Sequence, residues 1–159
     1  MDAILELLHE NGRRTAAELA ALSGEDEQAV AKKISGWEED GTILGYQAVI
    51  DGDRAGNKDV EALIEVRITP ERNGGFNRVA ERISKFEQVV SCVLMSGGYD
   101  LAVLVRGGDL RDVARFVSEK LASLDGVLST ATHFRLKVYK QNGLLARPEP
   151  ARERLPVSP

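Results

Sequence analysis

Apolar residues in the first forty positions recur at helical spacing and predict three short helices separated by turns. Residues 2–11 have apolar side chains three and four positions apart, which predicts a first helix. Gly12 should end this helix. Thr15 stands three residues before Glu18. This is the spacing of a capping box, so a second helix should begin directly after Thr15. Gly24 is expected to end that helix.

A third helix is predicted after Asp26, whose carboxylate suits an N-terminal cap. Val30, Ile34 and Trp37 follow at helical spacing, which places Trp37 in the core rather than against a DNA base. Residues 42–50 are rich in residues that favour strands, so we expect a two-stranded wing there. Three helices and a wing are the layout of a winged helix-turn-helix.

The pattern changes after a polar stretch with two glycines at residues 51–59, which is typical of a linker. Residues 60–69 alternate apolar and polar side chains and predict a strand with one buried face. Further strands are predicted at residues 88–95, 99–106 and 127–140, and amphipathic helices at residues 76–86 and 113–124. The order βαββαβ is that of the ferredoxin-like fold.

Two helices can cover only one face of such a sheet, so the other face meets solvent or a partner. We expect Leu63, Cys92 and Tyr139 on the uncovered face, and a homodimer formed through it. Residues 141–159 hold four of the five prolines and show no periodicity, so we expect a flexible tail. The predicted α+β chain therefore comprises a winged helix-turn-helix (1–50), a linker (51–59), a ferredoxin-like domain (60–140) and a tail (141–159).

Charge is distributed unevenly between the two predicted domains. Residues 1–50 hold ten acidic and four basic residues, and residues 51–159 hold fifteen acidic and seventeen basic residues. The half predicted to bind DNA is therefore the acidic half. Its candidate phosphate contacts are Arg13, Arg14, Lys32 and Lys33. Gln28 is a candidate for reading an adenine edge, and the alternative for all five is a solvated surface.

Four residues between two predicted strands carry the second candidate site: Gly97, Gly98, Tyr99 and Asp100. A plain hairpin turn would explain the glycines. It explains less well a tyrosine and a carboxylate together, because a carboxylate suits an ammonium group and open backbone amides suit a carboxylate. Three hydroxyl residues could join this site, although β-propensity explains them nearly as well: Ser129, Thr130 and Thr132.

No metal or cofactor is predicted. His9 and His133 stand alone, and Cys92 lies in an apolar run where structural burial is the expected role. No nucleotide-binding or catalytic motif occurs, so we do not expect an enzyme. A single thiol, no apolar run long enough to span a bilayer and no signal-peptide pattern favour a cytoplasmic protein without a membrane segment.

Over about residues 1–140 the chain resembles the Lrp/AsnC (feast/famine) transcriptional regulators. Residues 38–46 (EEDGTILGY) match the family pattern of acidic residues, Gly, an aliphatic residue and Gly-Tyr, and residues 97–100 match its Gly-x-Tyr-Asp turn. The resemblance implies a transcriptional regulator that binds double-stranded DNA. Such a protein dimerises through the ferredoxin-like domain and often forms octamers. The resemblance also implies an effector, an amino acid or related metabolite, bound between dimers near the turn.

The third helix departs from the family pattern. Asp26 stands where family members commonly have a serine cap, and Ser35 and Gly36 occupy positions that are often basic. A ligand-binding or assembly module without DNA activity is therefore the alternative. A siroheme decarboxylase-like enzyme would share the two-domain layout but needs histidines around a tetrapyrrole, and the chain has two histidines.

Overall fold

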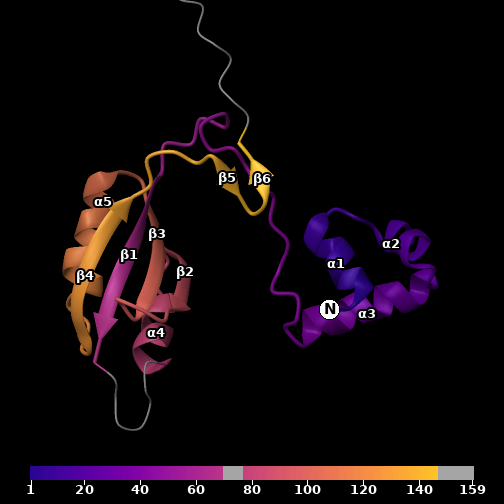
Figure 1. Ribbon diagram of the computed structural model, residues 1–159, viewed down its shortest axis with the longest axis horizontal. Helices are drawn as coiled ribbons and strands as arrows, with labels where there is room; N and C mark the ends of the chain where they lie inside the picture. Colours follow the sequence, from indigo (N-terminus) through magenta and orange to yellow (C-terminus); the bar gives the residue numbers. More distant parts are fainter. Residues whose placement is uncertain (70–76, 147–159) are drawn as a thin grey trace, which may run out of the picture. The chain divides into compact units, whose positions relative to one another are not determined.

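The computed structural model describes residues 1–69 and 77–146. The chain divides into two compact units, residues 1–49 and 50–159 (Figure 1). Three helices form the first unit: α1 (Ala3–Glu10), α2 (Ala16–Ser23) and α3 (Glu27–Glu39). Their order and positions agree with the three helices that the apolar spacing predicts.

Side chains cap the helices of the first unit where the sequence indicates. Thr15 and Glu18 form the capping box at the start of α2, and Asp26 accepts a hydrogen bond of 3.1 Å from the amide of Ala29. Each such cap contributes about 1 kcal/mol. The amide of Thr15 holds the pKa of Glu18 below its usual value, so the box is intact at neutral pH. Gly24 ends α2 in the left-handed conformation, with φ of 76°.

A small core joins the three helices. Its buried side chains are Ile4, Leu8, Leu19, Ala20 and Val30. Trp37 is partly buried and packs against this core, as its spacing predicts. The apolar face of α3 is therefore used to hold the unit together, and its opposite face is left to solvent.

The predicted two-stranded wing is wrong. Residues 42–50 contain no strand, and residues 44–50 are all exposed. The amide of Ile43 donates to the carbonyl of Trp37 at 2.8 Å, which ends the helical part of the unit. A high β-propensity reflects packing against a neighbouring strand, and these residues have no neighbouring strand in the part of the chain that the structure describes.

The second unit is built on a four-stranded antiparallel sheet in the order β2-β3-β1-β4, with its helices on one face (Figure 1). In chain order its elements are β1 (Val60–Ile68), α4 (Asn77–Ser84), β2 (Val89–Leu94), β3 (Leu101–Gly107), α5 (Leu110–Arg115), the π-helical η1 (Phe116–Leu121) and β4 (Val127–Phe134). The predicted α+β class and βαββαβ order are confirmed.

The core of this unit lies between the helices and the covered face of the sheet. Alternate residues of β1 and β3 point into it, and Ile64 of β1 lies opposite Val103 of β3 with both fully buried. Ile83 of α4 and Leu121 of η1 cover them from the helical side. Burying one such side chain contributes roughly 1.5–3 kcal/mol, so this core is the main source of the unit's stability.

The last predicted strand is shorter than expected. β4 ends at Phe134, and the chain then leaves the sheet and returns as a hairpin of β5 (Lys140–Gln141) and β6 (Leu144–Leu145). Asn142 and Gly143 have φ of 47° and 83°, the values a tight hairpin turn requires. Residues 141–146 were expected in the flexible tail but belong to this hairpin and its end, and residues 147–159 lie outside the described residues.

One of the three residues predicted for the uncovered face lies there. Leu63 pairs with His133 on the face away from the helices. Cys92 lies opposite the buried Val103, so its side chain faces the core, and Tyr139 lies beyond the end of β4. The Cys92 prediction was wrong because the run VVSCVLM is apolar at almost every position. Such a run does not show which of its side chains face the core. The Tyr139 prediction was wrong because the strand stops before it.

The Cys92 thiol should react slowly with alkylating reagents. Its Sγ lies 3.8 Å from the carbonyl oxygen of Ala80, and burial raises the pKa of the thiol. Because only the thiolate is the nucleophile, we expect its alkylation by iodoacetamide at neutral pH to be slower than that of free cysteine. The rate should rise to the free value in urea. Mass spectrometry over time measures both rates, and equal rates in buffer and urea would contradict the burial.

Candidate DNA-binding helices and effector turn

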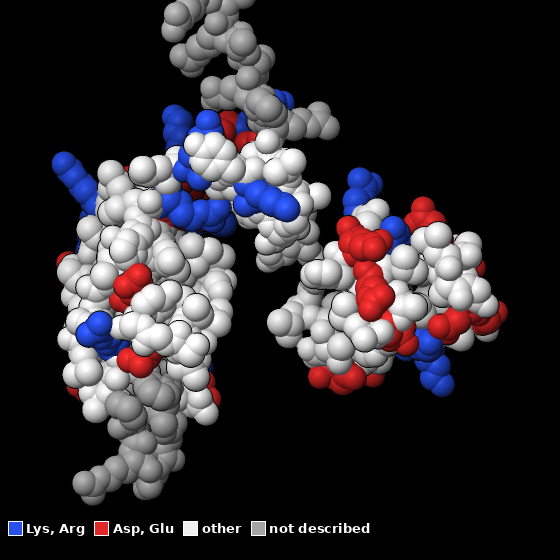
Figure 2. Space-filling view, in the orientation of Figure 1, with Lys and Arg blue, Asp and Glu red and all other residues white. Residues whose placement is uncertain are grey.

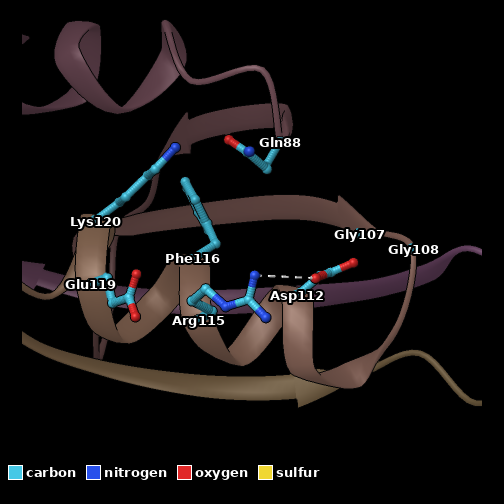
Figure 3. A pocket seen from close by; sticks show the side chains of 8 residues that line it. All are labelled: Gln88, Gly107, Gly108, Asp112, Arg115, Phe116, Glu119 and Lys120. Carbon is cyan, nitrogen blue, oxygen red and sulfur yellow. Dashed lines mark ion pairs between the residues drawn. The ribbon is translucent and has the colours of Figure 1, made fainter.

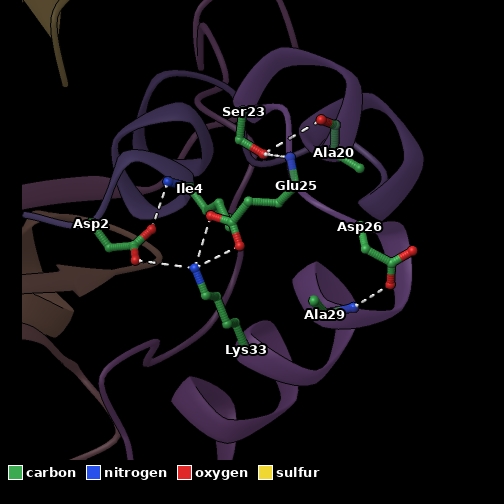
Figure 4. Close-up of polar contacts among 8 residues, drawn as sticks. All are labelled: Asp2, Ile4, Ala20, Ser23, Glu25, Asp26, Ala29 and Lys33. Carbon is green, nitrogen blue, oxygen red and sulfur yellow. Dashed lines mark hydrogen bonds and ion pairs between the residues drawn. The ribbon is translucent and has the colours of Figure 1, made fainter.

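Lys33 is engaged inside the first unit. Its Nζ lies 2.7 Å from Glu25 Oε2 and 3.6 Å from Asp2 Oδ2 (Figure 4). The hydrogen bond with Glu25 is the main cause that raises the pKa of Lys33. Lys33 therefore ties α3 to the start of α1 and to the turn between α2 and α3. Its ammonium group is already shared by two carboxylates, so it is a poor candidate for a phosphate contact.

Arg14 is engaged in the same way. Its Nη1 donates to the carbonyl of Leu7 at 2.5 Å and to Glu10 Oε2 at 3.1 Å. The Leu7 carbonyl also accepts from the amide of Asn11, so Arg14 adds a second hydrogen bond at the C-terminal end of α1, where a cation is favourable. Arg14 thus fixes the loop between α1 and α2.

Arg13 and Lys32 have the opposite surroundings. Both side chains are exposed, and neither forms an ion pair with another residue in the part of the chain that the structure describes. Of the four predicted phosphate contacts, these two are the ones available to an external anion. Lys32 lies four positions after Gln28, so the two share one exposed face of α3.

The unit that carries this face is rich in acidic residues. Figure 2 shows acidic side chains gathered over the helices of the first unit. Glu25 and Glu27 flank the Asp26 cap at the start of α3. An approaching phosphate therefore meets two free cations against several carboxylates, which limits the electrostatic part of binding by one subunit.

The turn at residues 97–100 is fastened to the end of β1. The amide of Met95 donates to the carbonyl of Asp100 at 2.8 Å, which closes the turn. Asp100 Oδ2 accepts from the amide of Ile68 at 2.8 Å, and Arg67 Nε donates to the carbonyl of Gly98 at 2.9 Å. The predicted carboxylate is therefore partly structural, and the turn is held in one place relative to the sheet.

The outer side of this turn is open. Gly97 has φ of 137°, so glycine is needed there, and a Cβ at Gly97 or Gly98 would meet no atom within 4 Å. No backbone amide of residues 97–99 is bonded to another described residue, and Asp100 Oδ1 has no hydrogen-bond partner among those residues either. The turn thus presents unpaired amides and one carboxylate oxygen side by side, the groups that an amino acid's two charged ends require.

The three candidate hydroxyl residues divide between the two faces of the sheet. Ser129 lies opposite Arg67 on the uncovered face, and Arg67 contacts the turn. Thr130 and Thr132 lie opposite buried residues of β1, on the face that carries the helices. The structure therefore brings Ser129 near the turn's anchor and does not bring Thr130 or Thr132 with it. Arg67 was missed because only the strand register shows that it reaches the turn.

A shallow depression lies elsewhere, between the end of β3 and the α5–η1 segment (Figure 3). On its α5 side Arg115 Nη1 lies 3.7 Å from Asp112 Oδ1, three positions earlier in the same helix. None of the residues predicted as functional lines it. Within residues 1–69 and 77–146 there is no group of three His, Cys, Asp or Glu side chains placed to hold a metal. No described helix is long and apolar enough to cross a membrane.

Known proteins resemble this chain over most of its length. The model of the Lrp/AsnC ligand binding domain matches residues 61–145. The HTH-type transcriptional regulator YugG of Bacillus subtilis is 45% identical over 157 residues, covering 98% of this chain and 95% of YugG. The HTH-type regulator LrpA of Pyrococcus abyssi is 32% identical over 124 residues, covering 78% of this chain and 85% of LrpA.

A solved structure has a similar fold. The transcriptional regulator NMB0573 of Neisseria meningitidis, determined as a complex with L-Met, is 27% identical with a TM-score of 0.67, covering 87% of this chain and 88% of that one. The family model spans more than half of the chain, and YugG is similar from end to end. The chain therefore belongs to the Lrp/AsnC family of transcriptional regulators.

Proposed function

We propose that the protein is a cytoplasmic, DNA-binding transcriptional regulator whose DNA binding or assembly responds to an amino acid. The α2–turn–α3 segment acts as the helix-turn-helix, with α3 in the major groove. The observation that carries this proposal is the exposed Gln28–Lys32 face of α3, presented by a unit in which Arg14 and Lys33 are used internally. Arg13 and Lys32 contact phosphates, and Gln28 reads a base edge.

Two free bases among residues 1–49 support only weak binding by a single DNA-binding unit. A homodimer doubles the number of phosphate contacts, and assembly of several dimers on one DNA raises the effective concentration of each further unit. Multivalent binding therefore compensates for the acidic surface of the first unit. This reasoning favours a homo-oligomer as the DNA-binding form.

The uncovered face of the sheet is suited to dimer formation. Leu63 and Leu104 lie side by side at its centre, and Glu65 pairs with His133 at 3.3 Å next to them. An apolar centre with a polar rim is typical of a surface between subunits. We propose that two copies pack through this face.

The effector site lies at the turn of residues 97–100. NMB0573 was solved with L-Met, which supports an amino acid as the class of ligand. In this chain the unpaired amides of residues 97–99 suit a carboxylate and the free oxygen of Asp100 suits an ammonium group. An amino acid that binds one assembly more tightly than another shifts the population toward the assembly it prefers. Binding of the amino acid at the turn would alter DNA binding in this way.

Asp100→Asn should weaken amino-acid binding roughly tenfold or more, because a charge-assisted hydrogen bond is worth about 1.5–3 kcal/mol. The asparagine can still accept the hydrogen bond from Ile68, so the turn should keep its shape. Calorimetric titration with each of the twenty amino acids measures the loss. Asp100→Ala is the comparison, since it removes the Ile68 contact as well and should also lower the Tm. A normal response of Asp100→Asn would show that the site is elsewhere.

The regulator proposal is tested by DNA capture. Immobilised protein is incubated with fragments of the genome that encodes it, and the recovered DNA is sequenced at several salt concentrations. We expect a small set of upstream regions to be enriched over the rest. Equal recovery of all fragments would contradict a regulator with defined operators.

One observation favours a second function. Because the first unit is strongly acidic and uses Arg14 and Lys33 internally, it could serve assembly instead of DNA binding. Such a module would show weak binding to DNA that changes little with salt, whereas phosphate contacts make binding fall steeply with salt.

A further inference from the structure

The β5–β6 hairpin of the second unit carries the kind of charge in which the first unit is poor. Residues 135–146 contain three basic residues and no acidic residue, and Figure 2 shows basic side chains over the hairpin. Residues 1–50 contain ten acidic and four basic residues. Contacts between basic side chains and phosphates supply most of the sequence-independent affinity for DNA. The hairpin is therefore better suited by charge to a DNA backbone than the helices are.

Polar contacts hold the hairpin against the sheet. Arg135 is paired with Glu61 of β1, and its Nη2 lies 3.3 Å from Oε1 of Gln141 in β5. The amide of Ala146 donates to the carbonyl of Tyr139 at 3.0 Å, which joins the two ends of the hairpin. Groups on a fixed ribbon lose less conformational freedom on binding than groups on a loose tail.

The base of the hairpin carries an excess of positive charge. Glu61 is shared between Arg135 and Arg106 of β3, whose Nη2 lies 2.7 Å from Glu61 Oε1. One carboxylate does not neutralise two guanidinium groups, so one positive charge remains. The Arg106 side chain is 48% exposed, so this charge acts on the solvent beside the hairpin.

The two lysines of the hairpin are available to an external anion. Lys137 and Lys140 are exposed, and neither forms an ion pair with any residue that the structure describes. Lys137 Nζ lies 5.4 Å from the centroid of the Tyr139 ring, a contact that orients the ammonium group and leaves its charge in place. The hairpin thus presents two ammonium groups that no carboxylate neutralises.

We propose that the β5–β6 hairpin contacts the phosphates of the DNA that α3 binds, through Lys137 and Lys140. This inference rests on the proposed regulator and adds to it a DNA-contacting surface in the domain that carries the effector turn. Phosphate contacts position a protein on DNA and carry no sequence information. The hairpin would therefore supply affinity that the acidic first unit lacks, while α3 selects the sequence.

Removing the two charges in the full chain tests this contact. Lys137→Gln with Lys140→Gln should weaken binding to upstream DNA and to random DNA by the same factor, at least about tenfold near 0.1 M salt. The slope of log affinity against log salt should fall by about two units or more. Each phosphate contact contributes about 0.9, and the proposed dimer has two copies of each lysine. Fluorescence anisotropy with both DNAs across a salt series measures these changes.

The matched control is Lys85→Gln with Lys120→Gln. Lys85 directly follows α4 and Lys120 lies in η1, and both are exposed on the helical side of the second unit. Lys120 Nζ also lies near an aromatic ring, 5.9 Å from the centroid of Phe86. The control thus removes the same charge and one cation–π contact, and we expect it to keep the wild-type slope. Both variants should keep the assembly of the wild-type protein by sedimentation velocity.

The remaining outcomes each overturn the proposal in a different way. A wild-type slope in the hairpin variant, with wild-type protein that binds its upstream DNA, would reject this contact and leave the proposed regulator intact. Equal losses in the hairpin variant and the control would show a general effect of net charge. A smaller assembly of the hairpin variant would show that the lysines meet an acidic surface of another copy instead of DNA. Wild-type protein that does not bind DNA at low salt would reject both the contact and the regulator.

Discussion

Replacing Arg13 and Lys32 with glutamine should lower the affinity of the proposed dimer for its DNA roughly a thousandfold at about 0.1 M salt. Each subunit would lose two phosphate contacts, so a dimer loses four. The slope of log affinity against log salt should fall by about four units, because each contact contributes about 0.9. Fluorescence anisotropy across a salt series measures both quantities.

The control is a variant with the same change in charge at positions away from the helices. Lys85→Gln with Arg111→Gln removes two exposed bases from the second unit and should leave the salt slope unchanged. Lys33→Gln should behave differently again, since it breaks the contacts with Glu25 and Asp2: it should lower the Tm while changing the slope little. If the Arg13 and Lys32 variant binds with the wild-type slope, these two residues do not contact phosphates.

Leu63→Asp should separate the proposed dimer. Leu63 lies at the centre of the uncovered face, beside Leu104 and opposite His133. A carboxylate buried there without a partner costs about 3 kcal/mol, so the dissociation constant should rise roughly a hundredfold. Sedimentation velocity over a range of concentrations measures the change.

Leu110→Asp is the matched control for that variant. Leu110 begins α5 and is 55% exposed, so the same substitution there should leave association unchanged. The Tm of Leu63→Asp at low concentration should stay close to that of the control, because Leu63 is outside the core of the unit. A dimer that survives in Leu63→Asp would place the contact between subunits on another surface.

The parts of the fold that depend on local signals could be predicted from the sequence. The Thr15–Glu18 capping box and the Asp26 cap act within three residues, so their spacing alone locates the starts of α2 and α3. The alternation of β1 is equally local, and its buried and exposed positions follow the predicted order. These signals were sufficient for the βαββαβ order.

The parts that depend on a distant neighbour could not be predicted. Residues 42–50 have the composition of strands, but a strand needs a second strand beside it, and the sequence does not show where that strand comes from. Cys92 was placed on the wrong face because its neighbours are apolar on both sides. The π-helical turn η1 also has no local signature, and its residues were expected in an ordinary helix.

The candidate sites show the same division. The Gly-x-Tyr-Asp turn is readable because its residues are adjacent, and its position between β2 and β3 agrees with the prediction. The sequence does not show whether a basic side chain is already paired within the unit. Lys33 contacts Asp2 and Glu25, and Arg14 contacts the end of α1. In the sequence Arg14 cannot be told from its neighbour Arg13, nor Lys33 from its neighbour Lys32. Only these contacts show which base of each pair is engaged.

The most direct test is the binding of the wild-type protein to its own upstream DNA, followed by fluorescence anisotropy. The titration is run across a salt series, against random DNA of equal length, and with and without a pool of the twenty amino acids. We expect tighter binding to the upstream DNA, a steep loss of affinity with salt and a shift when the pool is added. No binding at low salt, or binding that ignores salt and sequence, would contradict a regulator and leave an assembly module as the function.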